Sequence, residues 1–207
     1  VAKILVQDDQ AIGVQLADGT EHYANHIISA ADGHATIFDL LGGVYVDKHI
    51  HDYYQTIPVA PSILQIALGV NRDFSDQPPA FCFPLAAPLN FGDLRHDHLT
   101  VRHYAFDPTL ADPGKTSLNI WCAADYGYWK GLHMTPDAYE RAKEEVADQV
   151  IAALDWHYPG LAGQVEAVDV ATPVTYERYT ANWRGSIYGW AMTMRSTWPR
   201  SASAHGW

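Results

Sequence analysis

A long amphipathic segment, from about residue 136 to 158, constrains the fold more than any other feature of the sequence. Thr135 can cap a helix at this point, Pro136 suits its first position, and Asp137 suits the positive end of the helix dipole. Pro159 and Gly160 end the pattern. Acidic residues take one side of the segment, and apolar residues recur at helical spacing on the other: Tyr139, Ala142, Val146, Val150, Ala153 and His157. This is the strongest helix prediction in the chain.

Most of the other patterns predict strands. Apolar alternation marks residues 62–70, 99–106 and 116–124, and residues 165–174 form a fourth candidate. Prolines 78, 79, 84 and 88 interrupt the region between the first two strands. The strand and helix patterns alternate too irregularly for a Rossmann unit, and no glycine-rich phosphate loop is present. We therefore predict an α+β fold with a mixed or antiparallel sheet.

The N-terminal thirty residues predict a β-meander. Residues 4–6, 12–16 and 26–29 are the three predicted strands, with turns at residues 8–10 and 17–20. Asp32 then has the position of a helix N-cap, and Gly42-Gly43 supplies the helix end. Residues 44–61 are rich in aromatic residues and histidine and carry no clear period.

Composition excludes several classes of function. The chain of 207 residues has 24 acidic and 13 basic side chains, a net charge of −11, which disfavours a nucleic-acid partner and electrostatic attachment to anionic lipid. Two cysteines do not make a disulfide framework, and no apolar run is long enough to span a bilayer. We expect a cytoplasmic protein, whose contact with a membrane periphery would have to come from burial of an apolar patch.

Residues typical of metal or nucleophilic catalysis are present without the arrangement that such chemistry needs. His49 and His51 would face the same side of a strand, as would His96 and His98, but no cysteine joins them, so we predict no metal site. No G-x-S-x-G motif occurs, and Cys82 between two phenylalanines is expected to be a buried, inert thiol. The catalytic residues therefore stay unidentified.

Aromatic residues are the most informative group. The chain has seven Trp, twelve Tyr and six Phe, and clusters of them occur at residues 53–54, 81–83, 126–129 and 183–190. Such clusters commonly form a core, and they equally suit the walls of a site for a flat apolar ligand. The composition leaves both interpretations open.

Two segments carry a resemblance to a known family. The first is VAKILVQDDQAIGVQLADGTE, followed by ANHIISAADGHATIFDLLGG. The second, residues 171–190, reads ATPVTYERYTANWRGSIYGW, and RHYAFDPTLADPGKT and YPGLAGQVE between them also fit. Together they resemble the phytoene desaturase-like flavoproteins, a group that includes carotenoid desaturases, carotenoid isomerases and retinol saturases. The resemblance covers residues 1 to about 190.

The resemblance implies a two-domain FAD-dependent oxidoreductase with an apolar polyene or retinoid-like substrate. It assigns residues 1–31 to a β-meander of the FAD-binding domain and residues 32–190 to the substrate domain, whereas residues 191–207 depart from the family. By the same resemblance, the cofactor-binding residues are Val1, Ser29, Ala30 and Ala31, and the walls of a substrate tunnel near the flavin include Tyr188 and Trp190. Asp32 is assigned either to its helix cap or to tuning the flavin, and Tyr188 and Trp190 either to the tunnel or to the core.

The sequence also departs from the family at both ends. The G-x-G-x-x-G fingerprint and the C-terminal flavin motif are missing, and the chain begins with Val rather than Met. We therefore expect a fragment of an FAD-dependent oxidoreductase that transfers hydride to or from flavin, inactive alone and weak in FAD binding. The alternatives are a stand-alone binding module for an apolar ligand, a subunit that lacks flavin, and a truncated product without activity.

Overall fold

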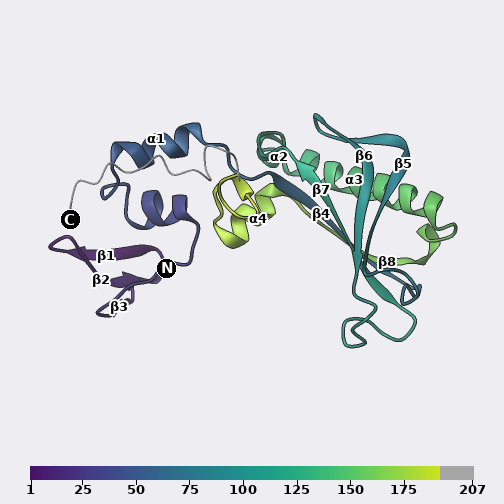
Figure 1. Cartoon of the computed structure of the whole chain (residues 1–207), viewed down its shortest axis with the longest axis horizontal. Helices are drawn as coiled ribbons and strands as arrows, with labels where there is room; N and C mark the ends of the chain where they lie inside the picture. The colour runs from purple at the N-terminus through teal and green to yellow at the C-terminus, as the bar shows by residue number, and fades with distance from the viewer. Residues whose placement is uncertain (192–207) are drawn as a thin grey trace. The chain divides into compact units, whose positions relative to one another are not determined.

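The computed structural model describes residues 1–191, and these form two compact units (Figure 1). Unit 1 contains residues 1–60 and 177–191, and unit 2 is Pro61–Tyr176. No helix among the described residues is both long and apolar enough to cross a membrane.

Unit 2 is built on one antiparallel sheet of five strands. The strands are β4 (Ser62–Val70), β5 (Ala80–Phe91), β6 (Leu94–His103), β7 (Thr116–Ala124) and β8 (Val165–Ala171). Their order across the sheet is β5-β6-β7-β4-β8, and every neighbouring pair is antiparallel. With the helices described below, this confirms the predicted α+β class and its antiparallel sheet.

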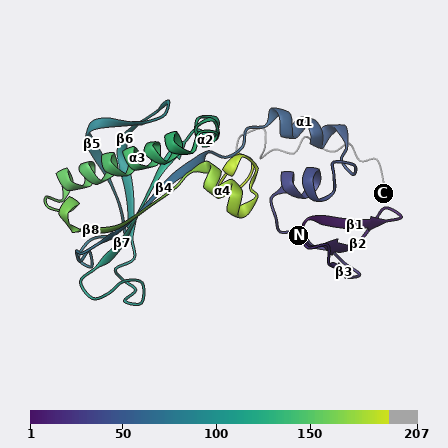
Figure 2. The same ribbon diagram turned by 180° about the vertical axis from the view of Figure 1, so that it is seen from behind.

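One face of this sheet forms the core. Successive side chains on a strand point to opposite faces, and cross-strand register brings apolar residues into a single row: Phe81, Val101, Ile120, Ile66 and Val170. Helix α3 (Pro136–His157) packs on this face through Val146, Val150 and Leu154. Figure 1 shows the strands in front of α3, and Figure 2, from behind, shows α3 in front of the strands.

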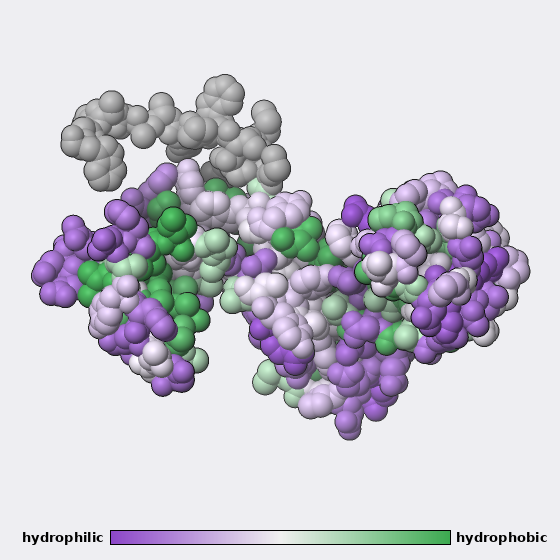
Figure 3. Space-filling view, turned by 90° about the horizontal axis from the view of Figure 1, so that it is seen from below, coloured by the Kyte–Doolittle hydropathy of each residue, from purple (hydrophilic) through white to green (hydrophobic). Residues whose placement is uncertain are grey.

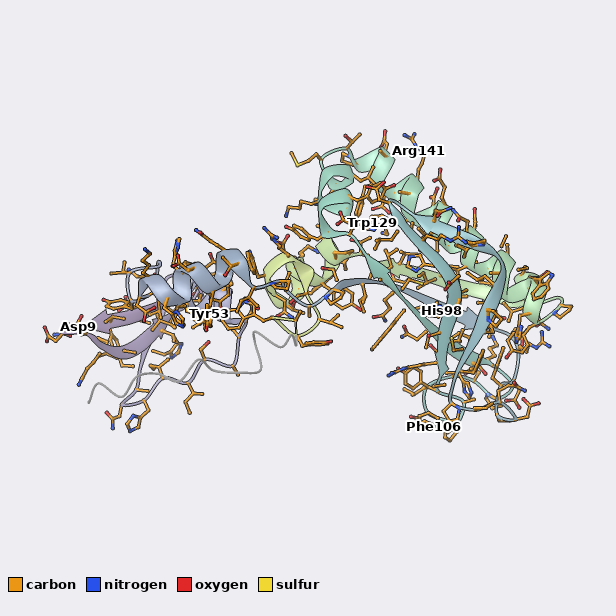
Figure 4. The ribbon with its side chains drawn as sticks, turned by 45° about the horizontal axis from the view of Figure 1, so that its top comes forward. Asp9, Tyr53, His98, Phe106, Trp129 and Arg141 are labelled. Atoms are coloured by element: carbon orange, nitrogen blue, oxygen red, sulfur yellow. The ribbon has the colours of Figure 1, made fainter. Side chains whose placement is uncertain are left out.

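The helix prediction at 136–158 is confirmed, with one difference at its start. Pro136 occupies the first turn and Asp137 supplies the acidic residue there, but the side chain of Thr135 makes no capping hydrogen bond. A shorter helix, α2 (Tyr126–His133), precedes it and was not predicted. Trp129 of α2 is buried and meets the ring of Tyr139 edge-on at 6.0 Å between ring centroids (Figure 4).

Proline explains why β5 was missed. Pro84 and Pro88 cannot donate backbone hydrogen bonds, which argues against a central strand. The structure accommodates both because β5 is an edge strand, with a register shift between Pro84 and Leu89. The neighbouring strand was predicted at residues 99–106 but runs from Leu94 to His103, where the buried His103 ring bonds to the Pro78 carbonyl at 2.8 Å.

The strand predicted at 165–174 also ends early. β8 stops at Ala171, and Pro173 begins helix α4 (Pro173–Thr180). Thr172 is fully buried between them, and its hydroxyl lies 2.7 Å from the Tyr139 hydroxyl. A short 3₁₀ turn, η2 (Ala162–Gln164), leads into β8.

Unit 1 begins with the predicted three-stranded meander. Its strands are β1 (Lys3–Gln7), β2 (Gln10–Gln15) and β3 (Glu21–Tyr23), all antiparallel. The third strand was predicted at 26–29, which is wrong, because the turn closed by Leu16 and Thr20 lets pairing resume at Glu21. A Cβ on Gly13 would collide with the His22 backbone, so only glycine permits this register.

Three helical segments complete unit 1. They are η1 (Ala35–Leu40), a π-helix, α1 (Lys48–Thr56) and the short 3₁₀ turn η3 (Trp183–Gly185). The helix predicted after Asp32 is thus present and ends at Gly42-Gly43, both with φ +68°. No element was predicted for residues 44–61, yet α1 forms there, and Asp47 caps it by accepting a hydrogen bond from the Ile50 amide at 2.8 Å.

The two units divide the chain at different residues from the predicted domains. Residues 32–60 and the segment from Glu177 belong with the meander rather than with the sheet of unit 2. The assignment of residues 1–31 to an FAD-binding domain and of 32–190 to a substrate domain stays a prediction. Of the departing tail, 191–207, only Ala191 lies within the described residues.

Unit 2 should depend on the contact between α3 and the sheet. Leu154 is fully buried in that contact, so Leu154→Ala should lower the free energy of unfolding by about 2–5 kcal/mol, as large-to-small core changes do. Glu145→Ala on the exposed side of the same helix should change it by no more than about 0.5 kcal/mol. Urea unfolding measures both, and equal effects would contradict the arrangement.

Candidate functional site

An aromatic cluster in unit 1 brings together segments that lie far apart in the sequence. The term aromatic cluster denotes six side chains here: His34, Phe38, Tyr53, Tyr54, Trp183 and Trp190. They come from η1, α1 and the chain around η3. Figure 4 labels Tyr53 on α1.

Asp32 positions the first segment. Its Oδ1 accepts a hydrogen bond from the Ala35 amide at 3.1 Å, and its carbonyl accepts one from Thr36 at 2.9 Å. The predicted helix cap is therefore present. The η1 helix then places His34 and Phe38 one turn apart, with ring centroids 4.7 Å from each other.

The chain after η3 closes the cluster. Trp183 stacks on His34, with centroids 4.5 Å apart and planes 6° from parallel. Residues 189–191 pair with the end of the α1 segment, because the Ala60 amide donates to the Gly189 carbonyl at 2.6 Å and Ala191 donates to Pro58 at 2.8 Å. This pairing directs Trp190 toward Tyr54, at 4.7 Å between centroids.

Tyr54 is at the centre of the cluster, with Phe38, Trp183 and Trp190 around its ring. Burial, and then the nearby charge of Asp32, raise the pKa of Tyr54. Because folding raises the pKa of Tyr54, the contribution of its protonated form to the stability of the fold is complete below the pKa of an unfolded tyrosine, about 10. It is lost as the pH rises through the higher folded value.

Trp190 carries an unusual feature. Its indole Nε1 is buried, and no described residue accepts its hydrogen bond. Such a buried donor costs about 1–3 kcal/mol when it has no partner. The cluster is thus an apolar, aromatic wall with one unused donor.

The structure separates the predicted site residues. Val1 is 65% exposed and Tyr188 64% exposed, and neither belongs to the aromatic cluster, whereas Trp190 does. Ser29, Ala30 and Ala31 are exposed, and the Ser29 hydroxyl lies 2.7 Å from that of Thr36. Their assignments to FAD and to substrate stay predictions.

The described residues do not by themselves form a site for FAD, the cofactor that the resemblance implies. A dinucleotide needs free amides at a helix N-terminus for its pyrophosphate. In this chain Asp32, Asp47 and Asp125 accept hydrogen bonds from the first amides of η1, α1 and α2. Each of these carboxylates would also repel a phosphate. The N-termini of these three helices therefore do not fit the group. Helix α3 begins without a side-chain cap, but Asp137 in its first turn would repel a phosphate in the same way. At the start of α4 the Thr175 amide already donates to the Thr172 hydroxyl.

A second candidate surface is the face of the unit 2 sheet opposite α3, here named the open face. Cross-strand register places two rows on it: Cys82, Thr100, Trp121, Gln65 and Ala171, and beside them Ala80, Arg102, Asn119, Ala67 and Asp169. Figure 1 shows this side of the strands without a helix in front of it.

Trp121 dominates the open face. It is 41% exposed, and its Nε1 donates to Asn119 Oδ1 at 2.9 Å. The Arg102 guanidinium lies over its ring at 4.8 Å, a cation–π contact. Small side chains such as Ala67 and Ala123 leave room for a flat ligand to approach the strands. The result is an aromatic platform with one cation at its side.

The sequence contained a signal for this surface that was not used. Along residues 116–124 the apolar residues Leu118 and Ile120 alternate with Asn119 and Trp121. Period two therefore sends Trp121 away from the core. The same period corrects the expectation for Cys82, which is exposed because Phe81 and Phe83 point inward; Cys122 is the buried thiol, and burial raises its pKa to about 12.

The histidines are dispersed. His49 and His51 lie on α1 rather than on a strand, so residues two apart no longer share a face. His98 is exposed on β6 and accompanies Asp97, whereas His103 is buried on the same strand (Figure 4). Among residues 1–191 no group of three His, Cys, Asp or Glu side chains could hold a metal ion.

Comparison with known proteins finds similar sequences along most of the chain. Chloroplastic prolycopene isomerase of Arabidopsis thaliana is 31% identical over 193 residues, 91% of this chain and 32% of that protein. The corresponding protein of Daucus carota is 32% identical over 91% of this chain and 31% of its own length. All-trans-retinol 13,14-reductase of Danio rerio is 33% identical over 82 residues, 37% of this chain and 14% of that protein.

The chain spans about a third of the length of the isomerases it matches. A crystal structure of an oxidoreductase from Methanosarcina mazei has a similar fold, with a TM-score of 0.51 and 20% identity over 83% of this chain and 36% of that one. No family model matches the chain.

Gly33 should be essential to the aromatic cluster. A Cβ at this position would lie 2.5 Å from the Tyr54 hydroxyl oxygen, so Gly33→Ala should displace Tyr54 and cost about 1–3 kcal/mol, as overpacking does. Tyr54→Phe removes the oxygen, and the double variant should recover most of the loss.

Gly131→Ala is the control for this experiment, because nothing lies within 4 Å of the added Cβ and the helical site favours alanine. Urea unfolding of the four variants gives the coupling energy between Gly33 and Tyr54. Independent effects of the two substitutions would show that the predicted contact is absent.

Proposed function

This chain belongs to the phytoene desaturase-like family of carotenoid isomerases and retinol saturases, and from that premise we propose that it forms the substrate-facing part of an FAD-dependent oxidoreductase. The similarity to prolycopene isomerases over 91% of the chain carries the proposal. The names of the relatives contain a carotenoid and a retinoid, so the proposed substrate is an apolar polyene or retinoid-like molecule.

The open face is our first candidate for contact with such a substrate. Aromatic platforms and small side chains suit a long flat ligand, and polar groups in small number fix its orientation. Trp121 would stack on the conjugated chain of the substrate. Arg102 and Gln65 would form hydrogen bonds with a polar end of the substrate or exclude molecules of the wrong shape. Gln65 is held in place by a hydrogen bond from the Tyr176 hydroxyl.

The aromatic cluster of unit 1 is the second candidate. Trp190, predicted as a tunnel wall, offers the cluster's unused donor to a ligand. Tyr188, exposed outside the cluster, would meet the same ligand from a different side. Both roles rest on the resemblance and on the exposure or unsatisfied donor described above.

The redox chemistry would belong to the flavin, which accepts or donates hydride when bound. Val1 and residues 29–31 would supply backbone contacts to that cofactor, as the resemblance implies. The chain's own residues would then orient the polyene and keep water from it. Peripheral contact with a membrane is a further part of the proposal. It would use exposed apolar residues such as Val44 and Tyr45 of unit 1, where Figure 3 shows hydrophobic residues at the surface.

A second candidate function is a non-catalytic binding module for an apolar ligand, or a subunit without flavin. The observation that favours it is the carboxylate at the start of η1, α1, α2 and α3, which disfavours a pyrophosphate at each of these helix N-termini. The open face and the aromatic cluster would serve this function equally.

Flavin retention tests the cofactor argument. We expect FAD added to the purified chain to be lost on desalting, because a carboxylate at the start of η1, α1, α2 and α3 would repel the pyrophosphate there. Absorbance near the flavin band measures the retained fraction. A stoichiometric yellow protein would contradict the conclusion that the described residues do not form an FAD site.

Polyene binding tests the substrate surface. All-trans-retinol should quench tryptophan fluorescence, and Trp121→Leu should weaken binding about tenfold, or about 1.4 kcal/mol, through loss of aromatic stacking. Trp156→Leu is the matched control, since Trp156 is 66% exposed on α3, away from the open face. Equal loss in both variants would refute the assignment.

The same titration separates the two functions. If the chain keeps weak contacts with flavin that do not survive desalting, excess FAD should change the apparent affinity for retinol, because linked sites affect each other reciprocally. A binding module should show the same retinol affinity with and without FAD.

A further inference from the structure

We infer that the groove between α3 and the edge strand β8 binds an extended segment of a partner polypeptide, with alternating apolar and basic side chains, as a sixth strand of the sheet. This inference concerns a different surface from the open face and does not depend on the proposed substrate.

The first observation is the unpaired edge. β8 pairs with β4 alone and ends the sheet, so in the described part of the chain its outer side carries a row of backbone N–H and C=O groups without a strand partner. Such an edge is a template for strand addition. Figure 2 shows β8 at the margin of the sheet, beside α3.

The second observation is an apolar floor along that edge. A hollow of about 350 Å³ lies between α3 and β8, with Ala147 and Ile151 on the helix and Val168 and Val170 on the strand. Val168 is 47% exposed although it pairs with the fully buried Leu68. Every second side chain of an added strand would point into this hollow.

The third observation is the charge at the rim. The carboxylates of Glu140, Glu144 and Asp148 on α3 line the same hollow, with Lys143 as the single cation among its lining residues. Lys143 is bound to Glu140 at 3.0 Å, and no described residue forms an ion pair with Glu144 or Asp148. Basic side chains on the incoming strand would complement this rim.

Charge also argues against two simpler explanations. A second copy pairing through its own β8 would bring two acidic rims together, which is unfavourable. Charges on an edge strand can serve only to prevent aggregation. Prevention of aggregation does not explain the apolar floor beside the edge, because the exposed Val168 and the partly exposed Ile151 would promote association.

The test uses a nine-residue peptide of alternating lysine and valine, labelled for fluorescence anisotropy, and the same peptide with glutamate in place of lysine. We expect the lysine peptide to bind at least tenfold more tightly and to weaken as salt is raised. Glu144→Lys, which reverses one charge of this rim, should reduce its affinity at least tenfold. Glu145→Lys, the same charge change outside the groove, should leave it within twofold.

Hydrogen exchange identifies the mode of binding. Amides of residues 166–170 should gain protection when the lysine peptide binds, and alternate N-methylation of the peptide should abolish both binding and protection. Binding without protection of β8, or equal effects of the groove and control substitutions, would overturn the inference. So would a dimer that protects β8 without peptide, since a second copy would then be the occupant.

Discussion

The organisation of unit 2 depends on one constraint: its sheet has two faces, and its one long helix covers a single face. Period-two alternation gives the sheet an apolar face, and α3 buries that face through Val150 and Leu154. No helix of comparable length covers the opposite face among the described residues. Trp121 and Arg102 are accessible because their face is not covered. The sheet also ends at β8, which has β4 as its neighbour on one side alone.

Sequence patterns predicted the elements that depend on local chemistry. The α3 helix followed from its periodicity and its Pro136 start, and β4 and β7 followed from alternating apolar residues. Two of the elements that were missed, β5 and α1, had local propensity against them. The prolines of β5 are tolerated only at a sheet edge, and the polar α1 is held by the cap at Asp47 and by packing of its aromatic side chains.

The candidate site was less predictable than the fold, because its parts meet through long-range contacts. His34 and Trp183 are stacked in space but far apart in sequence, and only the pairing of residues 189–191 with the chain at Pro58–Ala60 brings Trp190 to Tyr54. Resemblance selected Trp190 and Tyr188 together, yet Tyr188 is exposed outside the aromatic cluster and Trp190 packs within it. The outward direction of Trp121 was predictable from the period-two pattern alone. That it lies on an accessible surface follows only from the structure, in which no described helix covers that face of the sheet.

The distribution of charge connects these features to function. The chain has a net charge of −11, yet the open face carries its acidic residue, Asp169, only on the edge strand, and its central strands present Arg102, amides and small side chains. Burying a carboxylate against an apolar ligand would cost far more than burying an amide or a methyl group. Acidic residues on the exposed side of α3 and along β8 therefore keep the protein hydrated without penalising ligand contact on the opposite face. The proposed polyene would lose its water against Trp121, away from the acidic side chains of α3.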